Sequence, residues 1–538
     1  MIIDFIVIKT GDMTMNSHSI FNDVLGPIMA GPSSSHSAGC ARIGRWTRLL
    51  WGKDVKKAVV IYDSKGSYPS TCVGQVSNFG FTGGLLGLQN DDPRIKDSQK
   101  LAKEMDIDIS FSEEVLSQRH PNEARIDIYG ESGKVELSVL TFSIGGGMFE
   151  IVEMDGFKIF TDGSREQIYV CCTVSAQNNI YEKLKKIAKK ITVSTAENLN
   201  ILLCAEDFTA DYENITEYIK DLECEEGIVY IRKGAVVLPV PMKSESKPIF
   251  FTAKEALEYA KKTQKAMWEM AIDYECALGN ITTDEVWALA EHTLDIMKAA
   301  TTPPDPDKTE MFGFLPYQSA EMQKKSNAVK TVNTGYLDKA MMYALAVMEN
   351  SCAHNIVVAA PTAGSSGVIP AAVLAVGEEM GCTKEETVKG LLASGLAGAF
   401  IANQATFGAE IAACQAENGA ASAMAAAGVV QLLGGNTDQG FKAASLALEN
   451  MLGLICDPIG GLTEIPCISR NVIAMSNAVQ SANMVMLGFD PVIPLDETIL
   501  TMLEVGQSLP AELRCTCKGG LCTTKTAKCI VNKLEKSR

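Results

Sequence analysis

The chain has 538 residues, 46% of them apolar and 21% charged, which is a globular composition with room for several domains and excludes wholesale disorder. Its 48 basic and 65 acidic residues give a formal net charge of −17, so we expect no nucleic-acid partner. The first 15 residues carry no basic segment before their short apolar run, so we expect no signal peptide and a cytoplasmic protein. Its 16 cysteines are then expected to be reduced thiols.

The first part of the chain mixes one helix with short strands. Helical periodicity predicts a helix over Ala38–Trp51, and alternating apolar and polar residues around Gly-rich turns predict strands further on. These strands are expected over Ala124–Gly130, Val135–Gly145 and Met148–Phe160, as a hairpin or meander. We therefore expect residues 1–165 to form an N-terminal α+β domain of a substrate-binding or allosteric type.

The next part predicts a small central α+β module over residues 166–245, suited to a regulatory or packing role. Its elements are expected in the order strand, helix, strand, helix, strand, over Gln167–Val174, Asn178–Ile191, Leu199–Ala205, Tyr212–Leu222 and Gly227–Val240. The polar segment Pro241–Pro248 is the best candidate for a linker.

The last part, residues 246–538, begins with an amphipathic pattern from Ala253 to Ala300 and then becomes poor in charge. Between Ser351 and Pro510 there are 4 basic and 14 acidic residues among 160. A membrane segment and a buried core both fit such a stretch, but Pro and Gly interrupt its longest uncharged run. The small-residue stretch Ile411–Gly435, broken by Glu417, favours close helix packing. We expect a buried, mostly helical catalytic domain and no membrane partner.

Three cysteines of this charge-poor region, Cys414, Cys456 and Cys467, are candidates for a metal site. Their spacing is wider than the tight pairs of common zinc and iron–sulfur sites, so buried apolar thiols remain the alternative. Four more thiols lie near the C-terminus: Cys515, Cys517, Cys522 and Cys529. For these a zinc site, a redox or cluster-capping role and a mobile thiol-rich tail all stay open.

Several motifs resemble one known family, in the same order along the chain. The segment GPSSSH at Gly31–His36, HPN at His120–Asn122 and SIGGG at Ser143–Gly147 resemble the β-domain of iron–sulfur-dependent bacterial L-serine dehydratases. APTAGSSGVIPA at Ala360–Ala371 and LGLICDPIGGLTEIPCISRN at Leu452–Asn471 resemble the α-domain of that family. The resemblance thus implies a single-chain form in which both domains are fused.

The resemblance implies a [4Fe–4S] cluster on Cys414, Cys456 and Cys467, with one iron left open as a Lewis acid, and no pyridoxal phosphate. The implied reaction is deamination of L-serine, a small amino-acid substrate, to pyruvate and ammonia, by an oxygen-sensitive homodimer. Residues expected to contact substrate are Ser33, Ser34, Ser35, Thr362, Gly364, Ser365 and Arg470. A helix cap, a tight core turn and a structural ion pair are the plainer interpretations of these residues.

The base that removes the α-proton is the open point. Among five histidines, His36 and His120 are the candidates, although Gln75 stands where many relatives have a histidine. Two alternatives to the serine dehydratase remain, and that departure favours the first of them. One is a related lyase acting on another β-substituted amino acid, as a cysteine desulfidase does, and the other is a non-catalytic iron–sulfur or thiol sensor.

Overall fold

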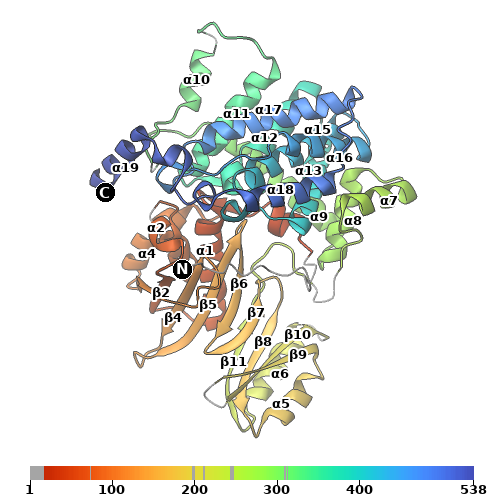
Figure 1. The fold of residues 1–538 in the computed structure, drawn as a ribbon. Coiled ribbons are helices and arrows are strands. Elements are labelled where there is room, and N and C mark those ends of the chain that lie inside the picture. The colour runs from red at the N-terminus through yellow and green to blue at the C-terminus, as the bar shows by residue number, and fades with distance from the viewer. Residues whose placement is uncertain are drawn as a thin grey trace.

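The computed structural model describes residues 17–72, 74–196, 200–209, 212–242, 247–307, 311, 313–326 and 328–537. The N-terminal segment expected to lack a signal peptide, and the middle of the expected linker, lie outside the described residues. From top to bottom, Figure 1 shows a helical part, a six-stranded sheet and a four-stranded sheet. This arrangement confirms the expected mixed α+β fold with a mostly helical C-terminal region.

The six-stranded sheet has the order β3-β2-β4-β5-β6-β7, with β2 and β3 parallel and the other neighbours antiparallel. Its strands are β2 (Lys57–Asp63), β3 (Asp108–Glu114), β4 (Glu123–Tyr129), β5 (Val135–Gly145), β6 (Met148–Met154) and β7 (Phe157–Thr161). Its helices are α1 (Gly39–Trp51), α2 (Tyr68–Thr71), α3 (Ser77–Leu85) and α4 (Ser98–Glu104). Trp46 of α1 and Phe81 of α3 are fully buried in the core shared with the strands.

The predicted strand Met148–Phe160 is two strands, β6 and β7, joined by a tight turn. Asp155 and Gly156 both have positive φ, of 52° and 83°. Two successive residues in that region form the kind of turn that matches the twist of antiparallel strands. The turn therefore adds one more strand to the expected meander.

The four-stranded sheet is antiparallel, in the order β11-β8-β10-β9. It contains β8 (Gln167–Thr173), β9 (Ala188–Thr195), β10 (Asn200–Phe208) and β11 (Ile228–Gly234), with helices α5 (Gln177–Leu184) and α6 (Tyr212–Glu223). The prediction of a helix as far as Ile191 is wrong, because β9 begins at Ala188. Pairing with β10, from Ala188 opposite Phe208 to Thr195 opposite Ile201, overrides the local helical pattern.

The helical part is built around long helices rich in small residues. Its helices are α7 (Ala253–Thr263), α8 (Met267–Leu278), α9 (Thr283–Ala300), α10 (Ser319–Lys325), α11 (Tyr336–Cys352), α12 (Val368–Met380), α13 (Lys384–Gln404), α14 (Ala409–Ala412), α15 (Ala420–Leu432), α16 (Thr437–Glu449), α17 (Cys467–Met486), α18 (Leu495–Ser508) and α19 (Lys525–Ser537). A Cβ on Gly428 of α15 would lie 2.7 Å from the carbonyl oxygen of Gly390 of α13, so glycine permits this close crossing. Within the described residues, no helix combines the length and apolarity that crossing a membrane requires.

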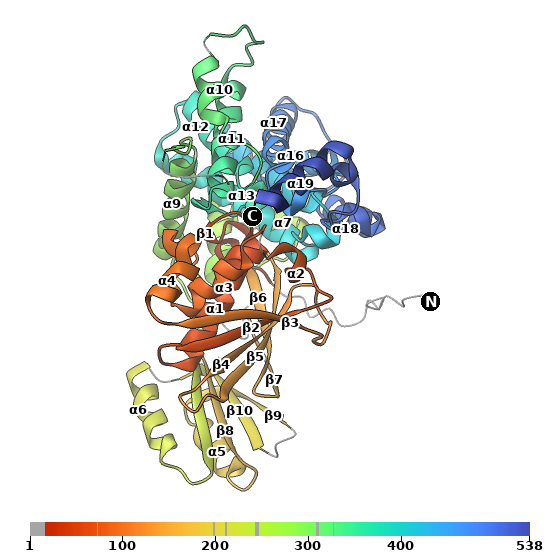
Figure 2. The ribbon, with the colours of Figure 1, turned by 90° about the vertical axis from the view of Figure 1, so that its left-hand side faces the viewer.

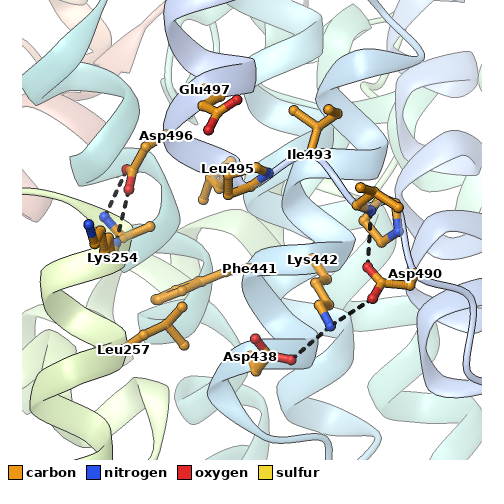
Figure 3. Close-up of a pocket in the computed structure, with 14 residues that line it drawn as sticks. Lys254, Leu257, Asp438, Phe441, Lys442, Asp490, Ile493, Leu495, Asp496 and Glu497 are labelled. Atoms are coloured by element: carbon orange, nitrogen blue, oxygen red, sulfur yellow. Dashed lines mark hydrogen bonds and ion pairs between the residues drawn. The ribbon is translucent and has the colours of Figure 1, made fainter.

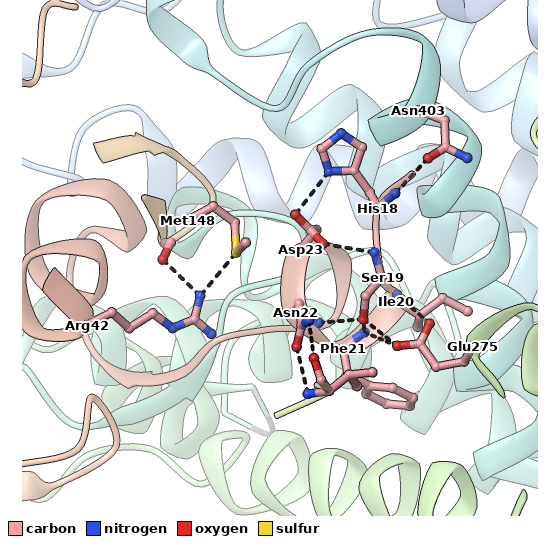
Figure 4. Close-up of polar contacts among 12 residues, drawn as sticks. His18, Ser19, Ile20, Phe21, Asn22, Asp23, Arg42, Met148, Glu275 and Asn403 are labelled. Carbon is pink, nitrogen blue, oxygen red and sulfur yellow. Dashed lines mark hydrogen bonds and ion pairs between the residues drawn. The ribbon is translucent and has the colours of Figure 1, made fainter. Parts of the chain in front are cut away.

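The N-terminal segment binds to the helical part before the six-stranded sheet begins. Strand β1 (Ile28–Ala30) pairs antiparallel with β12 (Ile356–Val358). The buried Glu275 accepts hydrogen bonds from the Ser19 hydroxyl and from the Ile20 amide, the latter at 2.8 Å (Figure 4). These contacts hold the following Ser-rich turn against the helical part.

Candidate functional site

The Ser-rich turn starts with Ser33 and continues as one helical turn over Ser34–Ala38. Ser33 Oγ accepts a hydrogen bond from the His36 amide at 3.1 Å, so the side chain caps the turn. Ser143 of β5 donates its hydroxyl to the Ser35 carbonyl at 2.7 Å. A Cβ on Gly39 would lie 2.6 Å from Ser143 Oγ, so the turn lies tightly against the sheet.

The imidazole of His36 is buried inside this turn and belongs to a polar chain. Its Nδ1 lies 3.0 Å from Ser35 Oγ, and its Nε2 lies 3.4 Å from Ser67 Oγ. Ser67 donates its one hydroxyl hydrogen to Asn122 Oδ1, so Nε2 of His36 donates to Ser67. That tautomer leaves Nδ1 as an acceptor facing the Ser35 hydroxyl. Burial lowers the pKa of His36 to about 4, so the ring is neutral near pH 7.

His120 lies at the far end of the same chain. Its Nδ1 accepts a hydrogen bond from the Asn122 amide at 3.0 Å, and its ring stacks on Phe142 with centroids 5.6 Å apart. The amide side chain of Asn122 also donates to the Ser143 carbonyl at 3.2 Å. His120 therefore supports the turn that holds Asn122.

A second turn, Ala363–Ser365, follows β12 in the helical part. Ser365 Oγ lies 3.2 Å from Thr362 Oγ1 and Ser365 is fully buried, so its hydroxyl contacts the start of the same turn. Asn471 of α17 donates its side-chain amide to the Gly364 carbonyl at 2.8 Å and accepts from the Gly367 amide at 3.0 Å. The hydroxyl of Thr362 donates to Glu417 Oε2 at 2.7 Å.

Two of the three predicted metal ligands converge on that glutamate. The Cys414 and Cys456 sulfurs and one Glu417 oxygen all lie within 4.8 Å of one another, which makes a candidate metal site. Cys467 begins α17, and its pKa is raised by burial first and then by the nearby Cys414 thiol. Cys456 is likewise buried, and contact with two other thiols raises its pKa well above the usual range. Buried thiols that lie this close together are the kind of ligand set that holds a metal ion.

Arg470 contacts this group of thiols and the segment that carries Cys456. Its Nη1 donates to Cys414 Sγ at 3.6 Å and to the Ile455 carbonyl at 2.9 Å. Its Nη2 lies 2.9 Å from Asp457 Oδ1, an ion pair in which the carboxylate is buried. The guanidinium thus links α17 to the segment that carries Cys456.

A pocket joins the two turns and the thiols. Of the residues that the sequence analysis assigns to substrate or metal binding, the pocket wall contains Ser33, Ser34, Ser35, Thr362, Gly364, Cys456 and Cys467. Outside the wall, and in contact with it through the bonds described above, lie His36, Ser365, Arg470 and Cys414. His120 is the most remote of the set. The wall thus combines residues from the six-stranded-sheet part and from the helical part.

The wall also contains residues that the sequence did not assign to the site: Gly145, Gly146, Glu410, Glu417 and Cys515. Burial raises the pKa of Glu410 and raises that of Glu417 to about 7. Glu417 could have been identified from the sequence, because it is a lone charge in an apolar stretch, three residues after Cys414. Gln75, which replaces the expected histidine, lines the pocket and donates its amide to the Gly461 carbonyl at 3.1 Å.

A different pocket lies between α7, α16 and the segment before α18 (Figure 3). Its wall combines the apolar side chains of Leu257 and Phe441 with Lys442, which pairs with Asp438 at 3.1 Å and Asp490 at 3.3 Å. It shares no wall residue with the thiol-lined pocket and presents no thiol. The three candidate cysteine ligands and the Ser-rich turn are therefore associated with the thiol-lined pocket and not with this one.

Comparisons with known proteins match both parts that build this pocket. The model of the family described as "Serine dehydratase alpha chain" matches residues 252–522. A probable L-serine dehydratase alpha chain of Bacillus subtilis (strain 168) is 35% identical over 286 residues, which is 53% of this chain and 95% of the relative. A probable L-serine dehydratase beta chain of the same organism is 42% identical over 156 residues, 29% of this chain and 69% of the relative. L-serine dehydratase 1 of Escherichia coli (strain K12) is 34% identical over 299 residues, 53% of this chain and 62% of the relative.

Proposed function

Since the chain belongs to the serine dehydratase family, with the alpha-chain and beta-chain parts fused in one polypeptide, we propose that it deaminates L-serine to pyruvate and ammonia. The observation that carries the proposal is the pocket in which the Ser33–Ser35 turn faces the thiols of Cys456 and Cys467. One wall offers hydroxyl and backbone N–H donors for a carboxylate, and the other offers metal ligands. Dehydration of a small β-hydroxy amino acid needs both the donors for its carboxylate and the metal.

The residues fit the iron–sulfur cluster that the motifs imply. Cys414, Cys456 and Cys467 are free, buried thiols, and the Arg470 guanidinium donates to the Cys414 sulfur. We propose that these three cysteines hold a [4Fe–4S] cluster. When bound, such a cluster supplies a Lewis acid at the iron without a protein ligand, which polarises the C–O bond of the substrate hydroxyl.

The protein's own residues then position the substrate and move its proton. We assign carboxylate binding to the donors of Ser33, Ser34 and Gly364, which line the pocket on two sides, whereas Thr362 lines it with its hydroxyl already donated to Glu417. Ser35 also lines it, and its hydroxyl faces the unprotonated Nδ1 of His36 at 3.0 Å. We propose that Ser35 takes the α-proton while passing its own proton to His36. The proton leaves with the substrate hydroxyl as water, and the resulting enamine tautomerises and hydrolyses to pyruvate and ammonia.

The test is pyruvate release from L-serine by anaerobically purified protein, compared between wild type and the Cys456→Ser variant. We expect wild type to contain iron and sulfide and to release pyruvate, and Cys456→Ser to lose both properties. Cys172→Ala, which changes a buried cysteine of the four-stranded sheet, is the control and keeps both. Iron and sulfide contents unchanged by Cys456→Ser would contradict the cluster assignment.

Gln75 at the pocket favours a second candidate, a lyase that expels sulfide from cysteine. An amide is not a base, so a substrate with a better leaving group demands less of this site. Iron-loaded protein that releases sulfide and pyruvate from L-cysteine, but no pyruvate from L-serine, would favour this candidate over the first.

A further inference from the structure

The residues before α19 fold back over the segment that follows Cys456. The Cys456 amide donates to the Leu513 carbonyl at 2.8 Å, and the Cys515 amide donates to the Cys456 carbonyl at 2.9 Å. Further on, the Leu521 amide donates to Asp457 Oδ2 at 2.8 Å. We call residues 511–523 the thiol strap. It is held at two points over a loop whose other side, through Cys456, Pro458 and Gly461, lines the pocket.

Two thiols of the strap converge on one atom of that loop. Cys517 Sγ lies 3.4 Å and Cys522 Sγ lies 3.1 Å from the carbonyl oxygen of Pro458, so both sulfurs donate to the same acceptor. Both side chains are half-buried, so a small reagent can reach them. Cys515 faces elsewhere, into the pocket beside Cys456.

The backbone of the strap is strained at these thiols. Cys515 and Cys517 have φ of 58° and 57°, in the left-handed region that L-residues other than glycine rarely adopt. Gly520 has φ of 57°, and a Cβ there would lie 2.4 Å from Asp457 Oδ2. Strain of this kind persists where the surrounding contacts fix a conformation, and here the hydrogen bonds to Cys456 and Asp457 fix it.

We propose that Cys517 and Cys522 form a redox modification site, a dithiol that closes reversibly to a disulfide. Hydrogen peroxide oxidises one thiol to a sulfenic acid and releases one water. The second thiol then attacks that sulfur, forms the S–S bond and releases a second water. A small dithiol reductant reverses the reaction by exchange, becoming a disulfide itself.

Oxidation changes the hydrogen bonds that hold the loop between Cys456 and Gly461. The disulfide has no S–H group, so the Pro458 carbonyl loses both thiol donors at once. The loop between Cys456 and Gly461 is then held less firmly by the strap. The inference does not rest on the proposed function, because the state of the thiols can be measured without turnover.

The experiment treats reduced full-length protein with one equivalent of hydrogen peroxide, blocks the remaining thiols with N-ethylmaleimide and maps tryptic peptides. Trypsin cleaves after Lys518, so Cys517 and Cys522 fall in separate peptides that a disulfide keeps together. We expect this linked pair, lighter by about 2 Da than the sum of its reduced peptides, and fragmentation that places the bond on Cys517 rather than Cys515. Dithiothreitol should restore both alkylated peptides.

Two variants sharpen the test. Cys522→Ser should abolish the linked pair and leave Cys517 as a sulfenic acid that dimedone traps, whereas the exposed Cys529→Ser should behave as wild type. The proposal is overturned if Cys517 and Cys522 remain fully alkylated while other cysteines oxidise. It is also overturned if the bond formed joins Cys515 to Cys456.

Discussion

Ser35 Oγ lies 3.0 Å from Nδ1 of His36, and the ring presents that nitrogen as an acceptor because its Nε2 donates to Ser67. The hydroxyl faces the pocket while the imidazole is buried behind it. A serine with an oriented, neutral histidine behind it can relay a proton although the histidine itself touches no substrate. We propose this pair as the base of the pocket that Cys456 and Cys467 also line.

The buried state of His36 predicts an acid-sensitive contribution to stability. The pKa is about 4 in the folded protein against 6.5 for an ordinary histidine, so the unfolded chain binds the proton first. Stability from this group is fully present above pH 6.5 and is lost as the pH falls toward 4, by about 3 kcal/mol in total. Urea unfolding between pH 4 and 7 should show a shallower loss for His36→Gln than for wild type. His292→Gln, at an exposed histidine, should follow wild type.

Ser67 fixes the tautomer of His36, so it is a positioning residue. Ser67→Ala leaves Nε2 without its acceptor and lets the hydrogen move to Nδ1, where it would oppose the Ser35 hydroxyl. We expect kcat to fall roughly tenfold to hundredfold with little change in KM. Ser64→Ala, at an exposed serine three residues earlier, should leave both constants unchanged. A rise in KM alone would indicate that Ser67 acts on substrate binding instead.

The sequence predicted the class of fold and the convergence of distant motifs, but not every residue between them. Periodicity located α1 and β5 within a residue, because their patterns agree with their packing. It missed β9, which forms through pairing with β10, a partner that local patterns do not contain. The thiol and Ser-rich motifs can be recognised in the sequence itself. The position of the strap depends on the chain folding back on Asp457, which the sequence pattern does not show.

Glu275 predicts how firmly the N-terminal segment is attached. Its buried carboxylate accepts from the Ser19 hydroxyl and the Ile20 amide, ahead of the Ser-rich turn (Figure 4). Glu275→Ala leaves these buried donors unpaired and should lower the free energy of unfolding by about 1–3 kcal/mol. Chemical denaturation measures the loss. Glu291→Ala, at a half-buried position of α9, is a control expected to change stability by less than about 0.5 kcal/mol.

Thr362 links the substrate-facing turn to the thiol group. Its hydroxyl donates to Glu417 Oε2 at 2.7 Å, and Glu417 lies within 4.8 Å of the Cys414 and Cys456 sulfurs. Thr362→Val keeps the shape but removes the donor, which leaves a half-buried carboxylate short of a partner at a cost of about 1–3 kcal/mol. Thr362→Ser keeps the hydroxyl and should stay near wild type. Denaturation of the metal-free protein measures this cost in stability. Iron retained by both variants when they are purified with metal would show that the metal site itself is intact. Equal stability of the Val and Ser variants would show that the hydrogen bond to Glu417 contributes nothing.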